Sequence, residues 1–190
     1  MFIQTEHTPN PETLKFIPGR VVMSKGTAFF QKSQNESPNS PFVQKLFKID
    51  GVEGVFFGSD FITITKSKNT SWDIIKPEIL GAIMNYYESG KENIEIEEEH
   101  KEEKNSTNSN EEDSNIVKQI KELIDTRVRP AVAMDGGDIV YESFKEGVVY
   151  LHMQGSCSGC PSSTATLKMG IENMLKHYVP EVKEVRPIND

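Results

Sequence analysis

The chain has 190 residues, enough for one large domain or two small ones, and a formal net charge of −8. The charge belongs to one segment, because residues 88–115 hold 11 acids and 3 lysines while residues 1–87 and 116–190 are each close to neutral. Neither flank has the basic excess of a nucleic-acid-binding protein, and two cysteines are too few for a disulfide-rich secreted scaffold.

The first residues, MFIQTEHTPNPETLKF, contain neither the basic segment nor the apolar run of a targeting peptide. No stretch approaches the ~18 apolar residues that span a bilayer. We therefore expect a soluble protein that binds neither membranes nor nucleic acid. Its compartment should be reducing: the bacterial cytoplasm, or an organellar matrix if a presequence has been removed. There, a CxxC motif is more often a metal or redox site than a structural disulfide.

Residues 1–90 predict a small domain of mixed helices and strands. A turn is expected at Thr8-Pro9-Asn10-Pro11, because two prolines cannot donate to a strand ladder. Ser40 and Pro41 form a helix start, and a second helix should end at Gly90. The expected strands are an opening strand at Phe2 and Ile3, Thr13–Ile17, Val52–Phe57 and Phe61–Thr65, and the second helix covers 71–89.

Residues 91–115 predict an acidic, disordered linker. Only two hydrophobes occur in this region, Ile94 and Ile96, among many Glu, Lys, Asn and Ser residues. Such a composition cannot bury enough apolar surface to offset the entropy of ordering.

Residues 116–190 predict a second small domain with the order α-β-β-α-β. Its first helix should be capped by Ser114 or Asn115 and end at Pro130. A tight turn, Asp135-Gly136-Gly137-Asp138, should precede a hairpin, and its two aspartates are interpreted as local turn caps rather than acid–base groups. The remaining expected elements are strands at 139–144 and 148–153, a helix at 161–178 and a strand at 182–188. The fold class is therefore α+β, with two small domains and a linker.

Both cysteines lie in one turn, Cys157-Ser158-Gly159-Cys160, between a strand and a helix. Pro161 suits the first helical position, which makes Cys160 the expected N-cap, and a helix N-terminus favours a thiolate. The pair is half of a metal site, since tetrahedral zinc or an iron–sulfur cluster needs four ligands. A second copy of the chain would complete it, so the spacing favours a metal-bridged homodimer; an unligated, reducible pair remains the alternative.

Two motifs resemble a known family. Met134-Asp135-Gly136-Gly137-Asp138-Ile139 followed by GSCSGCPSS at 155–163 is similar to the NifU-like domain of Nfu-type iron–sulfur scaffold proteins, over residues 116–190. TEHTPNPETLKF at 5–16, with the helix ending at Gly90, resembles the N-terminal domain of many Nfu proteins. The resemblance implies a non-enzymatic carrier in which Cys157 and Cys160 of two protomers hold a [4Fe–4S] cluster and pass it to apo-proteins. A [2Fe–2S] cluster stays open, and upstream cluster-assembly proteins are expected partners.

Two other functions remain as alternatives. A thiol–disulfide oxidoreductase would need a thioredoxin-like βαβ pattern at the CxxC, which the order α-β-β-α-β does not predict. A structural zinc module would use Cys157, Cys160, His152 and His177, whose spacing is not a standard zinc pattern. The N-terminal domain has no candidate ligands and is expected to position client or partner proteins.

Overall fold

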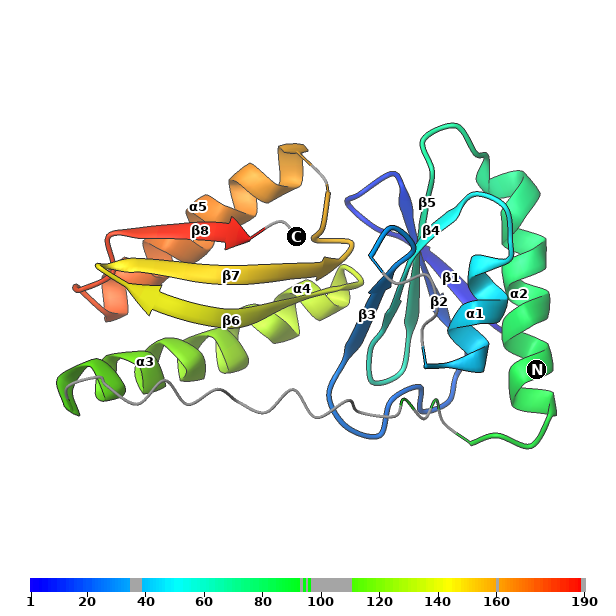
Figure 1. Cartoon of the computed structure of the whole chain (residues 1–190), viewed down its shortest axis with the longest axis horizontal. Helices are drawn as coiled ribbons and strands as arrows, with labels where there is room; N and C mark the ends of the chain where they lie inside the picture. Colours follow the sequence, from blue (N-terminus) through cyan, green and yellow to red (C-terminus); the bar gives the residue numbers. More distant parts are fainter. Residues whose placement is uncertain (35–38, 93, 95, 97–110, 160, 189–190) are drawn as a thin grey trace.

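Each half of the chain forms its own sheet and its own hydrophobic core. The computed structural model describes all residues except 35–38, 93, 95, 97–110, 160 and 189–190. The helices and strands form two domains, and each domain contains both, as the sequence predicts (Figure 1). One core is built from residues before the predicted linker together with Ile94, and the other from residues after it.

The N-terminal sheet is antiparallel throughout, in the order β1-β2-β5-β4-β3. Its strands are β1 Gln4–His7, β2 Thr13–Ile17, β3 Ala28–Gln31, β4 Val52–Phe57 and β5 Ile62–Lys66. The predicted opening strand is present, but its predicted position at Phe2 and Ile3 is wrong: the strand begins at Gln4, and Phe2 is 85% exposed. The edge strand β3 is an element that the sequence did not predict.

Two helices cover one face of this sheet, and both begin where the sequence predicts. The first, α1 Pro41–Phe47, has Ser40 as its N-cap, and its side chain accepts a hydrogen bond from the amide of Val43. The second, α2 Trp72–Glu88, is capped by Ser71 and followed by Gly90 at φ 86°. Their apolar faces pack on the sheet and close the N-terminal core.

The ends of the predicted linker belong to the two domains. Ile94 is buried in the N-terminal core and donates its amide to the carbonyl of Val22 at 2.8 Å, and Ile96 packs against the same core. At the other end, α3 begins at Glu111, earlier than the predicted cap at Ser114 or Asn115. Residues 97–110, the middle of the predicted linker, lie outside the described residues.

The helical segment that opens the second domain continues past Pro130, so the predicted end there is wrong. It consists of α3 Glu111–Leu123, a π-helical turn η1 Ile124–Val128, and α4 Arg129–Met134. The π turn changes the hydrogen-bonding register, and Pro130 falls in the first turn of α4, the part of a helix that tolerates proline.

The second sheet has three strands, in the order β6-β7-β8. A two-residue turn at Glu146 and Gly147, both with positive φ, joins β6 Gly137–Lys145 to the antiparallel β7 Val148–Gly155. Helix α5 Pro161–Tyr178 then leads to β8 Glu184–Ile188, which pairs with β7 in parallel. The predicted order α-β-β-α-β is confirmed, with η1 and α4 added to the first helix.

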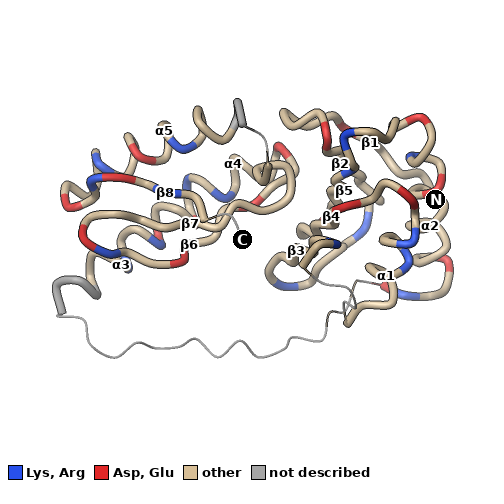
Figure 2. The backbone as a smooth tube through the Cα atoms, turned by 45° about the horizontal axis from the view of Figure 1, so that its top comes forward, with Lys and Arg blue, Asp and Glu red and all other residues tan. Residues whose placement is uncertain are grey.

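The second domain lies against the face of the N-terminal sheet that α1 and α2 leave open (Figure 1). Four residues of this face form what we call the docking face: Lys15, Phe56, Phe61 and Thr63. Lys15 and Thr63 donate hydrogen bonds to the second domain, Phe56 lies against Gly155, and Phe61 lines a pocket between the two domains. Phe56 and Phe61 are 1% and 4% exposed although neither belongs to the helix-covered core. Figure 2 shows acidic and basic residues interspersed over both domains. Of the described helices, none has the length and apolar character needed to cross a membrane.

Candidate functional site

The turn that carries the cysteines is tied to the Asp135–Asp138 turn of its own domain. It begins where β7 ends at Gly155, whose φ of 61° reverses the chain. The amide of Ser156 donates to the carbonyl of Gly136 at 3.2 Å, and its hydroxyl donates to the carbonyl of Asp135 at 2.6 Å. The two sequence motifs, Asp135–Asp138 and the cysteine turn, are therefore in direct contact through hydrogen bonds.

Cys157 points into its own domain rather than into solvent. Its side chain belongs to the second hydrophobic core, and the residue is 6% exposed. Gly137, the first residue of β6, is packed so closely against the Cys157 Sγ that a Cβ there would overlap with the sulfur. The amide of Cys157 donates to the carbonyl of Gln154 at 3.3 Å. In this conformation Cys157 is shielded.

Burial raises the pKa of the Cys157 thiol to about 12. The nearby carboxylates of Asp135 and Asp138 raise it further, while a hydrogen bond with Ser156 lowers it. For Cys157, burial outweighs the preference for a thiolate that the sequence predicts at the helix N-terminus; for Cys160, the expected N-cap, that preference stays a prediction. Iron binds the thiolate, which burial disfavours in this conformation.

Cys160, the other candidate ligand, lies outside the described residues. The helix that follows it starts at Pro161, as predicted. The interpretation of Cys160 as N-cap and as a ligand therefore stays a prediction.

None of the described histidines is grouped with Cys157. His152 lies on β7, with its Nε2 3.2 Å from a carboxylate oxygen of Glu142. His177 lies in the last turn of α5, sixteen residues beyond Pro161, a separation of roughly 24 Å along a helix. His7 lies on β1, and His100 is outside the described residues. Within the described part of the chain, no three His, Cys, Asp or Glu side chains form a group that could hold a metal ion.

The surroundings of the CxxC are a βαβ unit, which corrects one step of the sequence interpretation. Strands β7 and β8 are parallel and α5 connects them, so the turn with the cysteines lies at the carboxyl end of a strand and before a helix. The prediction that this fold has no thioredoxin-like βαβ pattern near the CxxC is therefore wrong. Chain order alone hid the pattern because it does not tell parallel pairs from antiparallel ones.

Asp138 does more than cap a turn. Its two carboxylate oxygens accept from the Arg129 guanidinium at 2.9 and 2.8 Å, and the Asp138 side chain is 5% exposed. This hydrogen bonding raises the pKa of Arg129 above its ordinary value. The hydroxyl of Thr27, from the other domain, also donates to Asp138 at 2.8 Å. Asp138 thus joins α4, β6 and the N-terminal domain at one point beside the site.

The N-terminal domain reaches the cysteine loop itself, which the sequence did not predict. The side-chain amide of Asn10 donates to the carbonyls of Ser158 at 3.1 Å and Ser156 at 3.4 Å. One signal for such a contact was present: Val55, Phe56 and Phe57 form an unbroken apolar run. In an antiparallel strand, such a run indicates burial on both faces.

Comparisons with known proteins agree with both parts of the chain. Residues 3–90 match the family model "Scaffold protein Nfu/NifU N terminal", and residues 120–186 match the NifU-like domain. The chain is 54% identical over 187 residues to NifU-like protein 4, mitochondrial, of Arabidopsis thaliana, covering 97% of this chain and 65% of that protein. It is 48% identical over 190 residues to the NFU1 iron-sulfur cluster scaffold homolog, mitochondrial, of Drosophila sechellia, covering 100% of this chain and 66% of that one.

The chain thus spans just under two thirds of the length of these relatives. Among solved structures, the solution structure of a NifU-like protein from Saccharomyces cerevisiae is 28% identical with a TM-score of 0.46. That match covers 52% of this chain and 87% of that one.

Proposed function

Because the chain belongs to the Nfu/NifU family of iron–sulfur cluster scaffold proteins, we propose that Cys157 and Cys160 of two chains together hold one [4Fe–4S] cluster. The cluster is cargo, passed on to apo-proteins, and the protein is a carrier rather than an enzyme. One observation carries the proposal: the chain has only two cysteines, and both lie in one turn before a helix. Two thiolates per chain and four per cluster require two chains.

The loop geometry suits a carrier. Gly155 and Gly159 both have positive φ, and the backbone around Cys157 is held by hydrogen bonds of the turn type rather than by a helix or strand. Such a loop rearranges at lower cost than a regular element, and a site split between two chains opens when the dimer loosens. We infer that the partners are cluster-assembly proteins upstream and apo iron–sulfur proteins downstream, and that nucleic acid and membranes are not among them.

The mitochondrial names of the relatives support an organellar matrix as the compartment. The bacterial cytoplasm stays the alternative prediction. Either compartment keeps both thiols reduced and available for iron.

Anaerobic reconstitution with iron and sulfide tests the proposal. We expect a coloured dimer with about four irons and four sulfides, and loss of the visible absorbance in Cys157→Ala and in Cys160→Ala. Ser158→Ala is the matched control, because only backbone atoms of Ser158 make the described contacts, and it should load fully. A colourless protein would contradict the proposal, and about two irons per dimer would replace the [4Fe–4S] assignment with [2Fe–2S].

The βαβ setting of the CxxC favours one other function, that of a thiol–disulfide oxidoreductase. The state of Cys157 opposes it, because the attacking thiol of such an enzyme is exposed and its pKa is lowered, whereas this thiol is buried and its pKa is raised. Insulin reduction by the apo protein separates the two. We expect no rate above the dithiothreitol background, and a clear rate abolished by Cys157→Ala would favour the oxidoreductase.

A further inference from the structure

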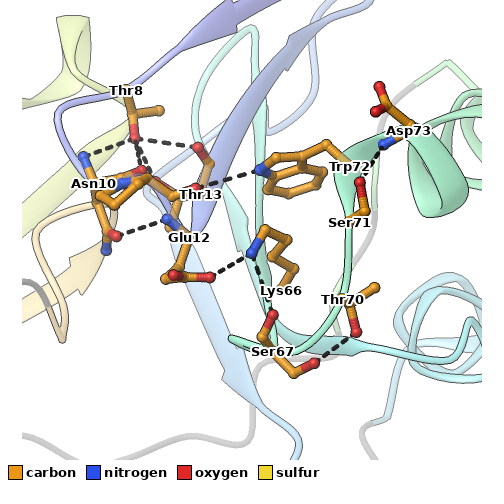
Figure 3. A network of polar contacts seen from close by, with 11 residues as sticks. Thr8, Asn10, Glu12, Thr13, Lys66, Ser67, Thr70, Ser71, Trp72 and Asp73 are labelled. Atoms are coloured by element: carbon orange, nitrogen blue, oxygen red, sulfur yellow. Dashed lines mark hydrogen bonds and ion pairs between the residues drawn. The ribbon is translucent and has the colours of Figure 1, made fainter.

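The Thr8–Thr13 turn of the N-terminal domain is held by hydrogen bonds among its own residues (Figure 3). From this turn, Asn10 reaches the cysteine loop. The side-chain carbonyl of Asn10 accepts from the amide of Glu12 at 3.0 Å, and the amide of Asn10 donates to the Thr8 hydroxyl at 3.2 Å. The turn is anchored from outside by Trp72, whose indole N–H donates to the carbonyl of Pro11 at 3.3 Å, and by the ion pair of Glu12 with Lys66.

These bonds fix which way Asn10 faces. Because its side-chain oxygen is engaged by Glu12, its NH₂ group is the part that points at the loop, where it meets two carbonyl oxygens. Asn10 is 3% exposed, so both contacts are shielded from water. The carbonyls that it holds belong to Ser156 and Ser158, the residues on either side of Cys157.

Two residues of the docking face also donate hydrogen bonds to backbone carbonyls of the second domain. Thr63 donates its hydroxyl to the carbonyl of Gly136 at 2.7 Å. Lys15 donates to the carbonyls of Ala133 and Met134 at 3.4 and 3.1 Å, where the end of α4 leaves carbonyls without helical partners. Lys15, Thr63 and Phe56 are register partners across β2, β5 and β4, so they form one row on the sheet.

Apolar contact completes the surface. The ring of Phe56 lies 3.0 Å from the position that a Cβ of Gly155 would occupy, so the sheet touches the loop at the residue where β7 ends. Phe56 is flanked by Phe61, with ring centroids 5.8 Å apart. The docking face therefore offers apolar rings and hydrogen-bond donors to a segment that presents glycines and backbone carbonyls.

We propose that Asn10 and the docking face form an intramolecular docking site for the cysteine loop, which holds Cys157 turned inward, so that cluster binding requires the two domains to separate. The inference rests on the proposed function for its second half. Turning the Cys157 side chain outward rotates the peptide groups on both sides of it. One of them, the Ser156–Cys157 peptide group, has its carbonyl held by Asn10, which also holds the carbonyl of Ser158 one peptide group further on. A second chain must also approach this loop, and the docked sheet occupies one side of it.

The docked and cluster-bridged forms then exclude each other, and the free energy of docking is subtracted from that of cluster binding. Cluster loading would free the docking face and the Asn10 turn for contact with another protein. The Thr-Pro-Asn-Pro motif, which the sequence tied to the family without a chemical role, thereby gains a positioning role.

Alkylation of Cys157 in the full-length apo protein tests the docking without any cluster. In a Cys160→Ser background Cys157 is the only thiol, and its rate with iodoacetamide reports how often it turns outward. Asn10→Asp keeps the oxygen that Glu12 needs but turns a charged oxygen toward two carbonyls. Asn69→Asp, on an exposed loop, is the matched control. We expect about a tenfold faster reaction for Asn10→Asp than for the control.

A second variant guards against misfolding of the first. Thr63→Val keeps the shape and strand preference of Thr63 and removes only the hydroxyl that donates to the carbonyl of Gly136. Thr5→Val is its control, because the strand partner of Thr5 is Phe16, which lies in the helix-covered core on the other face of the sheet. Equal alkylation rates in both variants and their controls, with unchanged circular dichroism, would overturn the proposal.

A second experiment measures cluster loading and uses the full chain with both cysteines. We expect Asn10→Asp to load iron and sulfide at a lower concentration than Asn69→Asp, and X-ray scattering to show that loading separates the domains. A loaded dimer with docked domains would overturn the proposal. If no variant loads a cluster, the proposed function fails, whereas the alkylation rates still decide the docking.

Discussion

At the scale of single residues, burial of the Cys157 thiol makes the stability of the apo protein depend on pH. The pKa of the thiol rises from its ordinary value of 9.0 to about 12 because burial penalises the thiolate. The folded state therefore holds this proton more tightly than the unfolded chain does. The contribution to stability is complete below pH 9, is lost as the pH rises toward 12, and falls by up to ~1.4 kcal/mol per pH unit in between.

We therefore expect the free energy of unfolding, measured with urea under reducing conditions, to decline as the pH rises above about 9. Cys157→Ala should decline less steeply, although burial of Tyr87 and Tyr141 also raises their pKa and leaves part of the slope. Identical slopes for the wild type and Cys157→Ala would mean that the thiol is not buried in solution.

Arg129 supports a buried carboxylate, and its removal should destabilise the second domain. When Arg129 is replaced, the Asp138 carboxylate still accepts hydrogen bonds from the Thr27 hydroxyl and the amide of Ile139. These bonds still stabilise its negative charge in part. We expect Arg129→Met to lower the free energy of unfolding by about 1–3 kcal/mol. Arg129→Lys, which keeps the charge but loses the two-pronged contact, should lie between that variant and the wild type. A loss for Arg129→Lys as large as for Arg129→Met would show that geometry rather than charge matters.

At the scale of elements, the contact between β6 and the cysteine loop leaves no room for a side chain. A Cβ on Gly137 would overlap the Cys157 sulfur and lie 2.9 Å from the carbonyl oxygen of Gln154, which is backbone and cannot yield easily. We expect Gly137→Ala to lower the melting temperature and to speed alkylation of Cys157, because the thiol is pushed out. Gly170→Ala is the control: it lies in α5 with open space around it and should stabilise the helix by up to ~1 kcal/mol.

Elements with local signals were predictable from the sequence. Ser40 with Pro41 fixes the start of α1, and Gly90 with a positive φ fixes the end of α2, since each signal acts within one helical turn. The edge strand β3 is only four residues long and pairs on one side, so its sequence carries little signal of its own. The helical segment continues past Pro130 because of the π turn before it, and no residue type in the sequence predicts a π turn there.

At the scale of the whole molecule, the candidate ligands could be predicted but their surroundings could not. Spacing and residue type identify Cys157, and they indicate a turn before a helix, because both are local properties. The burial of Cys157 depends on Gly137, and the hold on its loop depends on Asn10, which is 146 residues away from Ser156. Counting charges by segment describes the two domains as neutral but does not predict that they meet. Several of the hydrogen bonds between them go to backbone carbonyls, which carry no charge.

The N-terminal domain should extend beyond its predicted boundary at residue 90. Ile94 is 3% exposed within that domain's core, and its amide completes a hydrogen bond with Val22. Burial of an isoleucine of this kind contributes about 2–4 kcal/mol by comparison with alanine. We therefore expect the free energy of unfolding, measured with urea, to be about 2–4 kcal/mol higher for a fragment of residues 1–96 than for a fragment of residues 1–90.

The fragment 1–96 carrying Ile94→Ala is the matched control, because it has the same length and removes only the buried side chain. It should unfold at nearly the same urea concentration as fragment 1–90. If instead 1–90 and 1–96 unfold together, Ile94 is not held in the core of the isolated domain. Its packing would then depend on the second domain, and the docking face and the residues beyond Gly90 would have to be treated as one cooperative unit.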